Sequence, residues 1–237
     1  MSVWIRLHAQ LGTLALDVAL DWTDRPLALI GPNGSGKTTL LRIIAGAARA
    51  ERGVIVVGDR VLYRSVDGID LPSEERHVGY LPQGHGLFPH LSVRANVAFG
   101  LRHLPRAERL SRVRVALETV DLLALQDARP SELSGGQQQT VALVRALVTE
   151  PELMLLDEPL AAMDATNRRA LRSVLGARLQ GRPAIVVTHD ARDVAALGAD
   201  VCVLEEGEIV QRGSLFALRA DPQTAFVAEF VGQGTAG

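Results

Sequence analysis

The sequence predicts an α/β fold with a parallel-sheet core, an antiparallel β subdomain and an inserted α-helical lobe. Short continuous apolar runs at 27–30, 153–156 and 184–187 are typical of strands that helices cover on both faces. Alternating apolar residues over 3–20 indicate a hairpin with one buried face. Between 88 and 147 the strand signals stop and apolar residues recur at helical spacing, which predicts the helical lobe.

The antiparallel strands come first in the chain. The apolar positions that define the inward face of the first hairpin are Val3, Ile5, Leu7, Leu14, Leu16, Val18 and Leu20. A turn is expected at 11–13, between the two strands. A second β region is expected at 53–57 and 60–63, where Gly58 and Asp59 form the break.

The parallel core alternates strands with helices. Helical patterns at 38–48 and 165–179 adjoin the buried strands, and this alternation predicts right-handed crossovers in an α/β sheet. A last hairpin is expected where 201–204 and 209–210 flank a turn rich in glutamate. We therefore expect one domain, with an α/β core and its β subdomain at 1–87 and 148–237 and the helical lobe at 88–147.

Composition and charge narrow the class of protein. Of the 237 residues 47% are hydrophobic and 22% charged, as in a globular protein with a core. The formal charge is −2 with no dense run of Lys or Arg, so nucleic acid is not an expected partner. The single cysteine, Cys202, is expected to be a buried small hydrophobe. No signal-peptide stretch and no window of the ~20 apolar residues that span a bilayer are found, so the chain is expected in the cytosol or held at a membrane by another protein.

A glycine-rich loop at Gly31–Thr38 fits the pattern G-x-x-x-x-G-K-[ST] between a buried strand and a helix. Its glycines let backbone N–H groups face phosphate oxygens at a helix N-terminus. We expect Lys37 to reach the β- and γ-phosphates of ATP and the Thr38 hydroxyl to bind Mg²⁺. The alternative is a plain glycine-rich turn. The candidate nucleotide-binding residues of this loop are Gly31, Asn33, Gly34, Ser35, Gly36, Lys37, Thr38 and Thr39.

Two acids follow the buried strand at 153–156. The strand delivers Asp157 to the sheet edge, where it can hold Mg²⁺. Glu158, one residue further, is placed to polarise an attacking water. Two acids at a strand end are by themselves ordinary, and the glycine-rich loop upstream favours the functional interpretation.

A second candidate anion site opens the helix that follows Leu133. Its residues, a hydroxyl and bare N–H groups at a helix N-terminus, are Ser134, Gly135, Gly136 and Gln137. Ordinary helix caps do not need two glycines, which lower helix stability. The sequence thus places two phosphate-binding helix ends in different parts of the chain.

These motifs, in this order and spacing, resemble those of the ATP-binding subunit of ABC transporters over essentially the whole chain. The resemblance implies a P-loop NTPase (RecA-like) core and a head-to-tail homodimer. Each ATP would lie between one glycine-rich loop and the partner's Ser134–Gln137. It also implies that Gln83 contacts Mg²⁺ and the attacking water, and that His189 contacts the γ-phosphate. Asp164, within 162–164, would belong to the loop that links the two ATP sites.

The chain departs from the family pattern at two positions. The family places an aromatic ring that stacks on adenine at the position that Leu11 occupies here. A weaker apolar contact with the base is expected there. The family's second motif commonly continues to an arginine at the position of Thr140, and this change removes a structural ion pair but no catalytic group.

The resemblance is strongest to ATPases of molybdate-type (oxyanion) importers, on the segments 58–62, 68–72, 76–80, 221–222 and 226–232. In that group a β-rich regulatory domain commonly follows, and trans-inhibition through such a domain is not expected here. Integral-membrane permease subunits are expected to dock near Gly84–Val93, and a solute-binding protein to act indirectly. Alternatively, Phe88 and Leu91 are core residues of the helical lobe, and both descriptions can hold.

The implied function is ATP hydrolysis that drives import, at the cytoplasmic face of the inner membrane as a peripheral subunit. One alternative is a non-transport ABC ATPase of DNA repair or chromosome maintenance. The short interval between Gln83 and Ser134, without sustained heptads, argues against that alternative. The other is an ATP-gated switch without hydrolysis, against which Glu158 and His189 argue.

Overall fold

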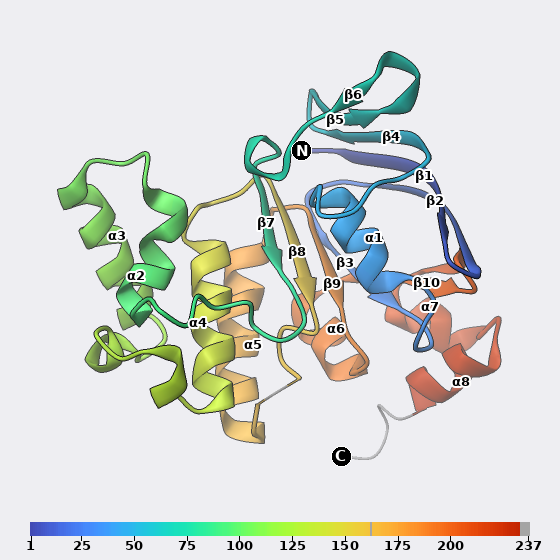
Figure 1. Cartoon of the computed structure of the whole chain (residues 1–237). Coiled ribbons are helices and arrows are strands. Elements are labelled where there is room, and N and C mark those ends of the chain that lie inside the picture. The colour runs from blue at the N-terminus through green and yellow to red at the C-terminus, as the bar shows by residue number, and fades with distance from the viewer. Residues whose placement is uncertain (162, 233–237) are drawn as a thin grey trace.

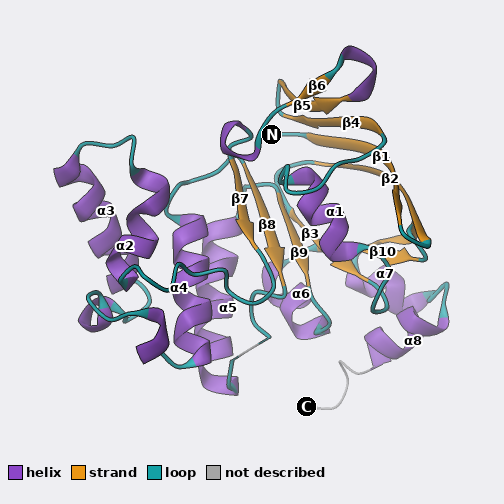
Figure 2. Cartoon of the chain, viewed as in Figure 1, coloured by secondary structure: helices purple, strands orange, loops and turns teal. Residues whose placement is uncertain are grey.

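A computed structural model describes residues 1–161 and 163–232, without the side chain of Leu11. Its centre is an 11-stranded sheet in the order β6-β5-β4-β1-β2-β11-β10-β3-β9-β8-β7. The antiparallel strands lie together on one side of the molecule and the parallel strands at its middle (Figures 1 and 2). The mixed α/β architecture expected from the sequence is confirmed.

The antiparallel half of the sheet is built around β1 (Val3–Leu11), which pairs with β2 (Leu14–Trp22) and with β4 (Arg52–Val57). The strands β5 (Arg60–Arg64) and β6 (Ile69–Asp70) extend this edge. Alternate residues of β1 and β2 are buried, which confirms the expected hairpin and its inward face.

The parallel half contains β3 (Pro26–Ile30), β7 (Val78–Leu81), β8 (Leu153–Asp157), β9 (Ala184–Val187) and β10 (Asp200–Glu205). These strands pair in parallel, and every residue of β3, β8 and β9 is buried, as their continuous apolar sequences predict. The carboxyl ends of the strands therefore meet at one sheet edge.

One strand, β11 (Glu208–Gly213), joins the two halves. It forms the expected hairpin with β10 and pairs in parallel with β2 at Glu208 and Asp17. The backbone N–H of Asp17 donates to the carbonyl of Gly207 at 2.8 Å. A Cβ atom at Gly207 would lie 1.9 Å from the Ala15 carbonyl oxygen, so this junction requires glycine. The antiparallel subdomain is consequently continuous with the parallel core.

The helices lie on both sides of the parallel strands in Figure 1, with α2 to α5 toward the left and α1, α7 and α8 toward the right. Their bounds are α1 (Lys37–Ile44), α2 (Val93–Ala98), α3 (Arg106–Glu118), α4 (Gly135–Leu147), α5 (Ala165–Leu179), α6 (Ala191–Leu197), α7 (Leu215–Ala220) and α8 (Ala225–Gly232). α1 packs in one apolar cluster with the antiparallel strands, and α4 to α8 pack in a second. Residues of α2, α3 and α4 share a third.

The buried thiol of Cys202 belongs to the cluster around α1 and is fully shielded from solvent. Burial raises its pKa to about 12, so the expected role as a small hydrophobe is confirmed. No helix within 1–161 and 163–232 has the length and apolar character needed to cross a bilayer.

The helix expected at 38–48 ends earlier, at Ile44, and this part of the sequence prediction was wrong. The next turn contains Gly46 at φ +78°, and the N–H groups of Ala47 and Ala48 both bond to the carbonyl of Arg42. The guanidinium of Arg76 occupies the end of the helix and donates to the carbonyls of Ile43 and Ile44, each at 2.8 Å. A cation at a helix C-terminus satisfies both the free carbonyls and the helix dipole.

Replacing Arg76 with Met is expected to destabilise the fold by about 3 kcal/mol, because buried carbonyls would lose their donor. Arg76 is 1% exposed and also donates to the Leu71 carbonyl and the Asp70 carboxylate, both at 2.7 Å. Urea denaturation measures the change in the free energy of unfolding. The control is Arg64→Met, which breaks an exposed ion pair with Asp67 and should change stability by under about 1 kcal/mol. Equal stability losses for the two variants would contradict this interpretation.

Candidate nucleotide-binding site

The glycine-rich loop lies between β3 and α1, and two of its glycines are required by geometry. A Cβ atom at Gly31 (φ +152°) would lie 1.9 Å from the Leu204 carbonyl oxygen. Gly36 adopts φ +104° as the N-cap of α1, and a Cβ there would lie 3.0 Å from Leu16 Cδ1. The loop therefore sits against the sheet with its following helix N-terminus open, the arrangement that suits an anion.

Lys37, the only lysine of the chain, begins α1. Its Nζ donates to the carbonyl of Gly31 at 2.8 Å and to that of Pro32 at 2.7 Å. Burial lowers the pKa of Lys37, while the nearby acids Glu158 and Asp157 act in the opposite direction. The ammonium is thus held inside the loop, next to the two acids that follow β8.

A side-chain hydrogen bond between Thr38 and Asp157 joins the start of α1 to the end of β8. The Thr38 hydroxyl donates to Asp157 Oδ2 at 2.7 Å, and Asp157 is 1% exposed. Burial raises the pKa of Asp157 above its usual range, the bond from Thr38 lowers it, and the adjacent charge of Glu158 raises it further. A hydroxyl and a carboxylate side by side are hard oxygen donors, so this pair fits Mg²⁺, which proteins hold with one or two side chains and substrate phosphates.

A cleft of about 380 Å³ lies over these groups. It brings together most of the candidate residues from three separate segments of the chain. Its lining is Leu14, Asn33, Gly34, Gly36, Lys37, Thr38, Thr39, Gln83, Asp157, Glu158 and Val187. Gln83, which follows β7, thus reaches the same space as the two acids, as its position after a core strand led us to expect.

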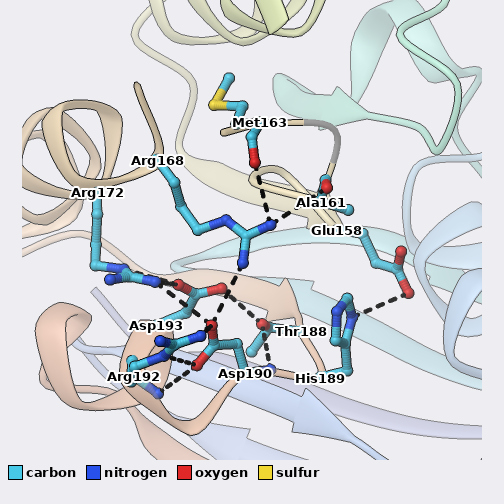
Figure 3. Close-up of polar contacts among 10 residues, drawn as sticks. All are labelled: Glu158, Ala161, Met163, Arg168, Arg172, Thr188, His189, Asp190, Arg192 and Asp193. Carbon is cyan, nitrogen blue, oxygen red and sulfur yellow. Dashed lines mark hydrogen bonds and ion pairs between the residues drawn. The ribbon is translucent and has the colours of Figure 1, made fainter. Parts of the chain in front are cut away.

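Glu158 has an unusual backbone for a non-glycine residue, with φ +50°. Its N–H donates to the Val187 carbonyl at 3.1 Å, which fixes it between β8 and β9. Left-handed backbone at such a residue costs of order 1–3 kcal/mol and clusters at functional sites. His189 Nδ1 lies 3.8 Å from Glu158 Oε1, and the imidazole is 69% exposed (Figure 3). The structure brings these two candidate residues together at the carboxyl end of the sheet.

The second candidate anion site lies apart from the cleft. Ser134 and Gln137 cap α4 reciprocally: Gln137 Oε1 accepts from the Ser134 N–H at 2.9 Å, and Ser134 Oγ accepts from the Gln137 N–H at 3.3 Å. An added Cβ at Gly135 would meet no heavy atom within 4 Å. Among the described residues none of 134–137 lines the cleft, so one chain does not unite the two sites. Thr140 bonds its own helix, with Oγ1 donating to the Gly136 carbonyl at 2.8 Å.

Asp164 is the N-cap of α5 and is absent from the described lining of the cleft. Its Oδ1 accepts from the N–H groups of Thr166 and Asn167, both at 3.0 Å. Bonds from Asn167 hold the pKa of Asp164 below its usual range. The neighbouring Ala162 and the side chain of Leu11, the expected adenine contact, lie outside the described residues.

The segment expected to dock a permease is anchored by residues that the sequence did not reveal. The fully buried Asn96 receives the N–H of Phe88 at 2.8 Å and donates to the carbonyls of Phe88, Leu91 and Ser92. Arg145 donates to the Gly86 carbonyl at 2.9 Å and lies over the Phe88 ring. Phe88 and Leu91 are half-buried, which suits both of the alternatives left open above. Asn96 and Arg145 follow no motif, and only three-dimensional contacts identify them.

A glycine-rich phosphate loop, a Thr–Asp pair and an acid beyond it, all at the carboxyl edge of parallel strands, define a P-loop nucleotide-binding protein. The model of the ABC transporter family matches residues 21–161. The chain belongs to the ABC transporter family and carries its ATPase domain.

Relatives of known name agree with this assignment. The molybdate/tungstate import ATP-binding protein WtpC of Archaeoglobus fulgidus is 40% identical over 98% of this chain and 94% of its own length. The molybdenum import ATP-binding protein ModC of Paramagnetospirillum magneticum is 40% identical over 91% of this chain, which spans only 60% of that relative. Relatives 40% to 43% identical are named for import of sulfate/thiosulfate, Fe(3+) ions and spermidine/putrescine.

A solved structure shares the fold as well. It is the dimeric post-hydrolysis state of the ATP-binding cassette MJ0796, bound to ADP and Pi. The two folds agree with a TM-score of 0.79 at 26% identity, over 90% of this chain and 98% of the other. The P-loop NTPase fold implied by the sequence resemblance is therefore confirmed.

Proposed function

We propose that this chain is an ATP-hydrolysing subunit that works as a head-to-tail homodimer and drives solute import through a separate membrane permease. The observation that carries the proposal is the separation of two phosphate-binding helix ends. Lys37 and Thr38 line the cleft, whereas Ser134 stands exposed at the start of α4. A second copy can supply Ser134–Gln137 to the open side of the cleft. The cleft of one chain and these residues of the other would then form one complete ATP site.

The residues of the cleft divide the chemistry among them. The N–H groups of the loop and Lys37 would hold the β- and γ-phosphates of ATP. Thr38, Asp157 and Gln83 would hold Mg²⁺, which supplies charge neutralisation at the phosphates when bound. Glu158 would accept the proton of the attacking water, and His189, beside it, would contact the γ-phosphate. The partner's Ser134–Gln137 would complete the site, and Asp164 would belong to the loop that links the two ATP sites.

The partner in the membrane is proposed to dock at Gly84–Val93. The rings of Phe88 and Phe99 are tilted by 40° to each other with their centroids 4.4 Å apart, and the exposed fraction of Phe99 is 38%. An apolar surface of this kind suits a short helix of a permease subunit laid into a groove. The chain would then act as a peripheral subunit on the cytoplasmic face, with a solute-binding protein contributing indirectly.

Molybdate, or a related oxyanion, is the proposed cargo. The sequence resemblance and the names of the ModC and WtpC relatives support it, and the sulfate/thiosulfate relative also imports an oxyanion. The competing cargoes are the Fe(3+) ions and polyamines for which other relatives are named. Vesicles that contain this chain together with its partner permease are expected to accumulate radiolabelled molybdate when ATP is present. Accumulation of polyamine or iron in place of oxyanions would assign a different cargo.

The specific ATPase activity is expected to rise with protein concentration, because each complete site needs two chains. The increase should be steepest where dimers are scarce and should level off once all chains are paired. Steady-state phosphate release, measured across the monomer–dimer range found by light scattering, tests this. A Ser134→Arg variant is the control, since it blocks the partner's contribution and leaves the cleft intact. A specific activity that stays constant over the whole range would count against a shared site.

A further inference from the structure

Two arginines of α5 face two acids, Asp190 and Asp193, that follow His189 in the chain (Figure 3). Arg172 Nε donates to Asp193 Oδ1 at 2.8 Å, and Arg168 Nη1 lies 3.5 Å from Asp190 Oδ2. Asp190 directly follows His189 and is the N-cap of α6. All four charged side chains are at most 24% exposed, so their contacts are better shielded than those of surface ion pairs.

Arg172 Nη2 and Arg192 Nη2 also lie near Asp190 Oδ2, at 3.6 Å and 2.9 Å. Arg168 differs from them because it has a second set of contacts, with the loop before α5. Its Nη2 lies 3.4 Å from the carbonyl oxygen of Ala161 and 3.3 Å from that of Met163. Both carbonyls belong to the loop between Glu158 and Asp164. The guanidinium therefore bridges this loop to the acid beside His189, with one end on each.

Together with the backbone, these contacts form a closed ring that includes Glu158 and His189. From Glu158 the chain runs through the loop to the carbonyls that Arg168 holds, then across Arg168 to Asp190 and its neighbour His189. The 3.8 Å approach of His189 Nδ1 to Glu158 Oε1 completes it. Arg168 Nε is buried and has no hydrogen-bond partner among the described residues.

We infer that Arg168 is a positioning residue that couples the loop after Glu158 to His189, so that engagement of the loop aligns the imidazole with Glu158. The inference rests on the proposed function, because it assigns Arg168 a part in ATP hydrolysis. Arg168 lies outside the described lining of the cleft, so it contributes to alignment and not to ATP affinity.

The experiment replaces Arg168 with Met, which keeps the length of the side chain and removes both ends of the bridge. We expect kcat for ATP hydrolysis to fall roughly 10- to 100-fold, as small misplacements of reacting groups do, with Kd for ATP unchanged within about twofold. In a His189→Ala background the same substitution should lower kcat by less than about threefold, because its effect passes through His189. Arg168→Lys, which can reach only one end of the bridge, should fall between Met and the wild type.

The matched control is Arg169→Met, an exposed neighbour on the same helix that should leave kcat unchanged. A second readout needs no hydrolysis: the ring NMR signal of His189 should shift in Arg168→Met and stay in place in Arg169→Met. An unaltered kcat and ring signal, or a full multiplicative loss in the His189→Ala background, would overturn the coupling. If the wild type fails to hydrolyse ATP, the proposed function fails, and the His189 signal still decides whether Arg168 positions the ring.

Discussion

Replacing Glu158 with Gln is expected to abolish ATP turnover and leave ATP binding intact. Glutamine keeps the size of the side chain and its left-handed backbone but cannot accept the proton of an attacking water. General-base catalysis contributes roughly 10²- to 10⁴-fold, and the loss of turnover should fall in that range. Single-turnover phosphate release measures the loss, and light scattering should detect an ATP-bound dimer that persists because hydrolysis no longer separates it.

The structure offers a closely matched control for this variant. Glu206, in the turn between β10 and β11, also has a left-handed backbone, at φ +49° against +50° for Glu158, and it is exposed. Glu206→Gln thus makes the same chemical change in the same backbone conformation, outside the cleft. Wild-type turnover in Glu158→Gln would remove Glu158 from the role of general base.

Loss of the Lys37 ammonium should weaken ATP binding about 10- to 150-fold, the effect of about 1.5–3 kcal/mol for a hydrogen bond to a charged group. In the structure this half-buried ammonium is held by two loop carbonyls, so it is oriented before phosphates arrive. Titration calorimetry with ATP compares Lys37→Ala with the wild type.

The control for Lys37→Ala is Arg42→Ala, which removes a positive charge from the exposed face of the same helix. It should leave the ATP affinity within about twofold, because screened charges contribute little at that distance. Urea denaturation of both variants separates lost affinity from lost stability, since Gly31 and Pro32 lose a donor in Lys37→Ala. Unchanged affinity in a folded Lys37→Ala would remove the lysine from the phosphate site.

Local sequence patterns were sufficient for much of the fold. The alternation over 3–20 specifies a hairpin, and the spacing over 165–179 predicted α5 with the bounds that the structure shows. The end of α1 was mispredicted because its cause is remote: Arg76 lies more than thirty residues along the chain from the carbonyls it caps. The junction at Gly207 is equally non-local, since it depends on a close approach to Ala15.

In the candidate site, too, some residues could be predicted from local sequence patterns and others depend on contacts between distant segments. Lys37, Thr38 and Asp157 stand at fixed places after buried strands, and parallel strands bring their ends together, so spacing predicted their assembly. Asn96, Arg145 and Arg168 were missed because each acts through backbone carbonyls of a distant segment. Carbonyl acceptors leave no mark in a sequence, and only the folded chain reveals them.

Because Lys37 is the single lysine of this chain, the glycine-rich loop can be labelled selectively through its side-chain amine. All the other residues counted as Lys or Arg are arginines. Their guanidinium groups do not react with acylating electrophiles under mild conditions. Apart from the amino terminus, such reagents meet one amine, and burial lowers its pKa and so enlarges its reactive neutral fraction. The position at which the phosphates of ATP are proposed to bind is thus also the one side-chain position at which a fluorophore or crosslinker of this type can attach.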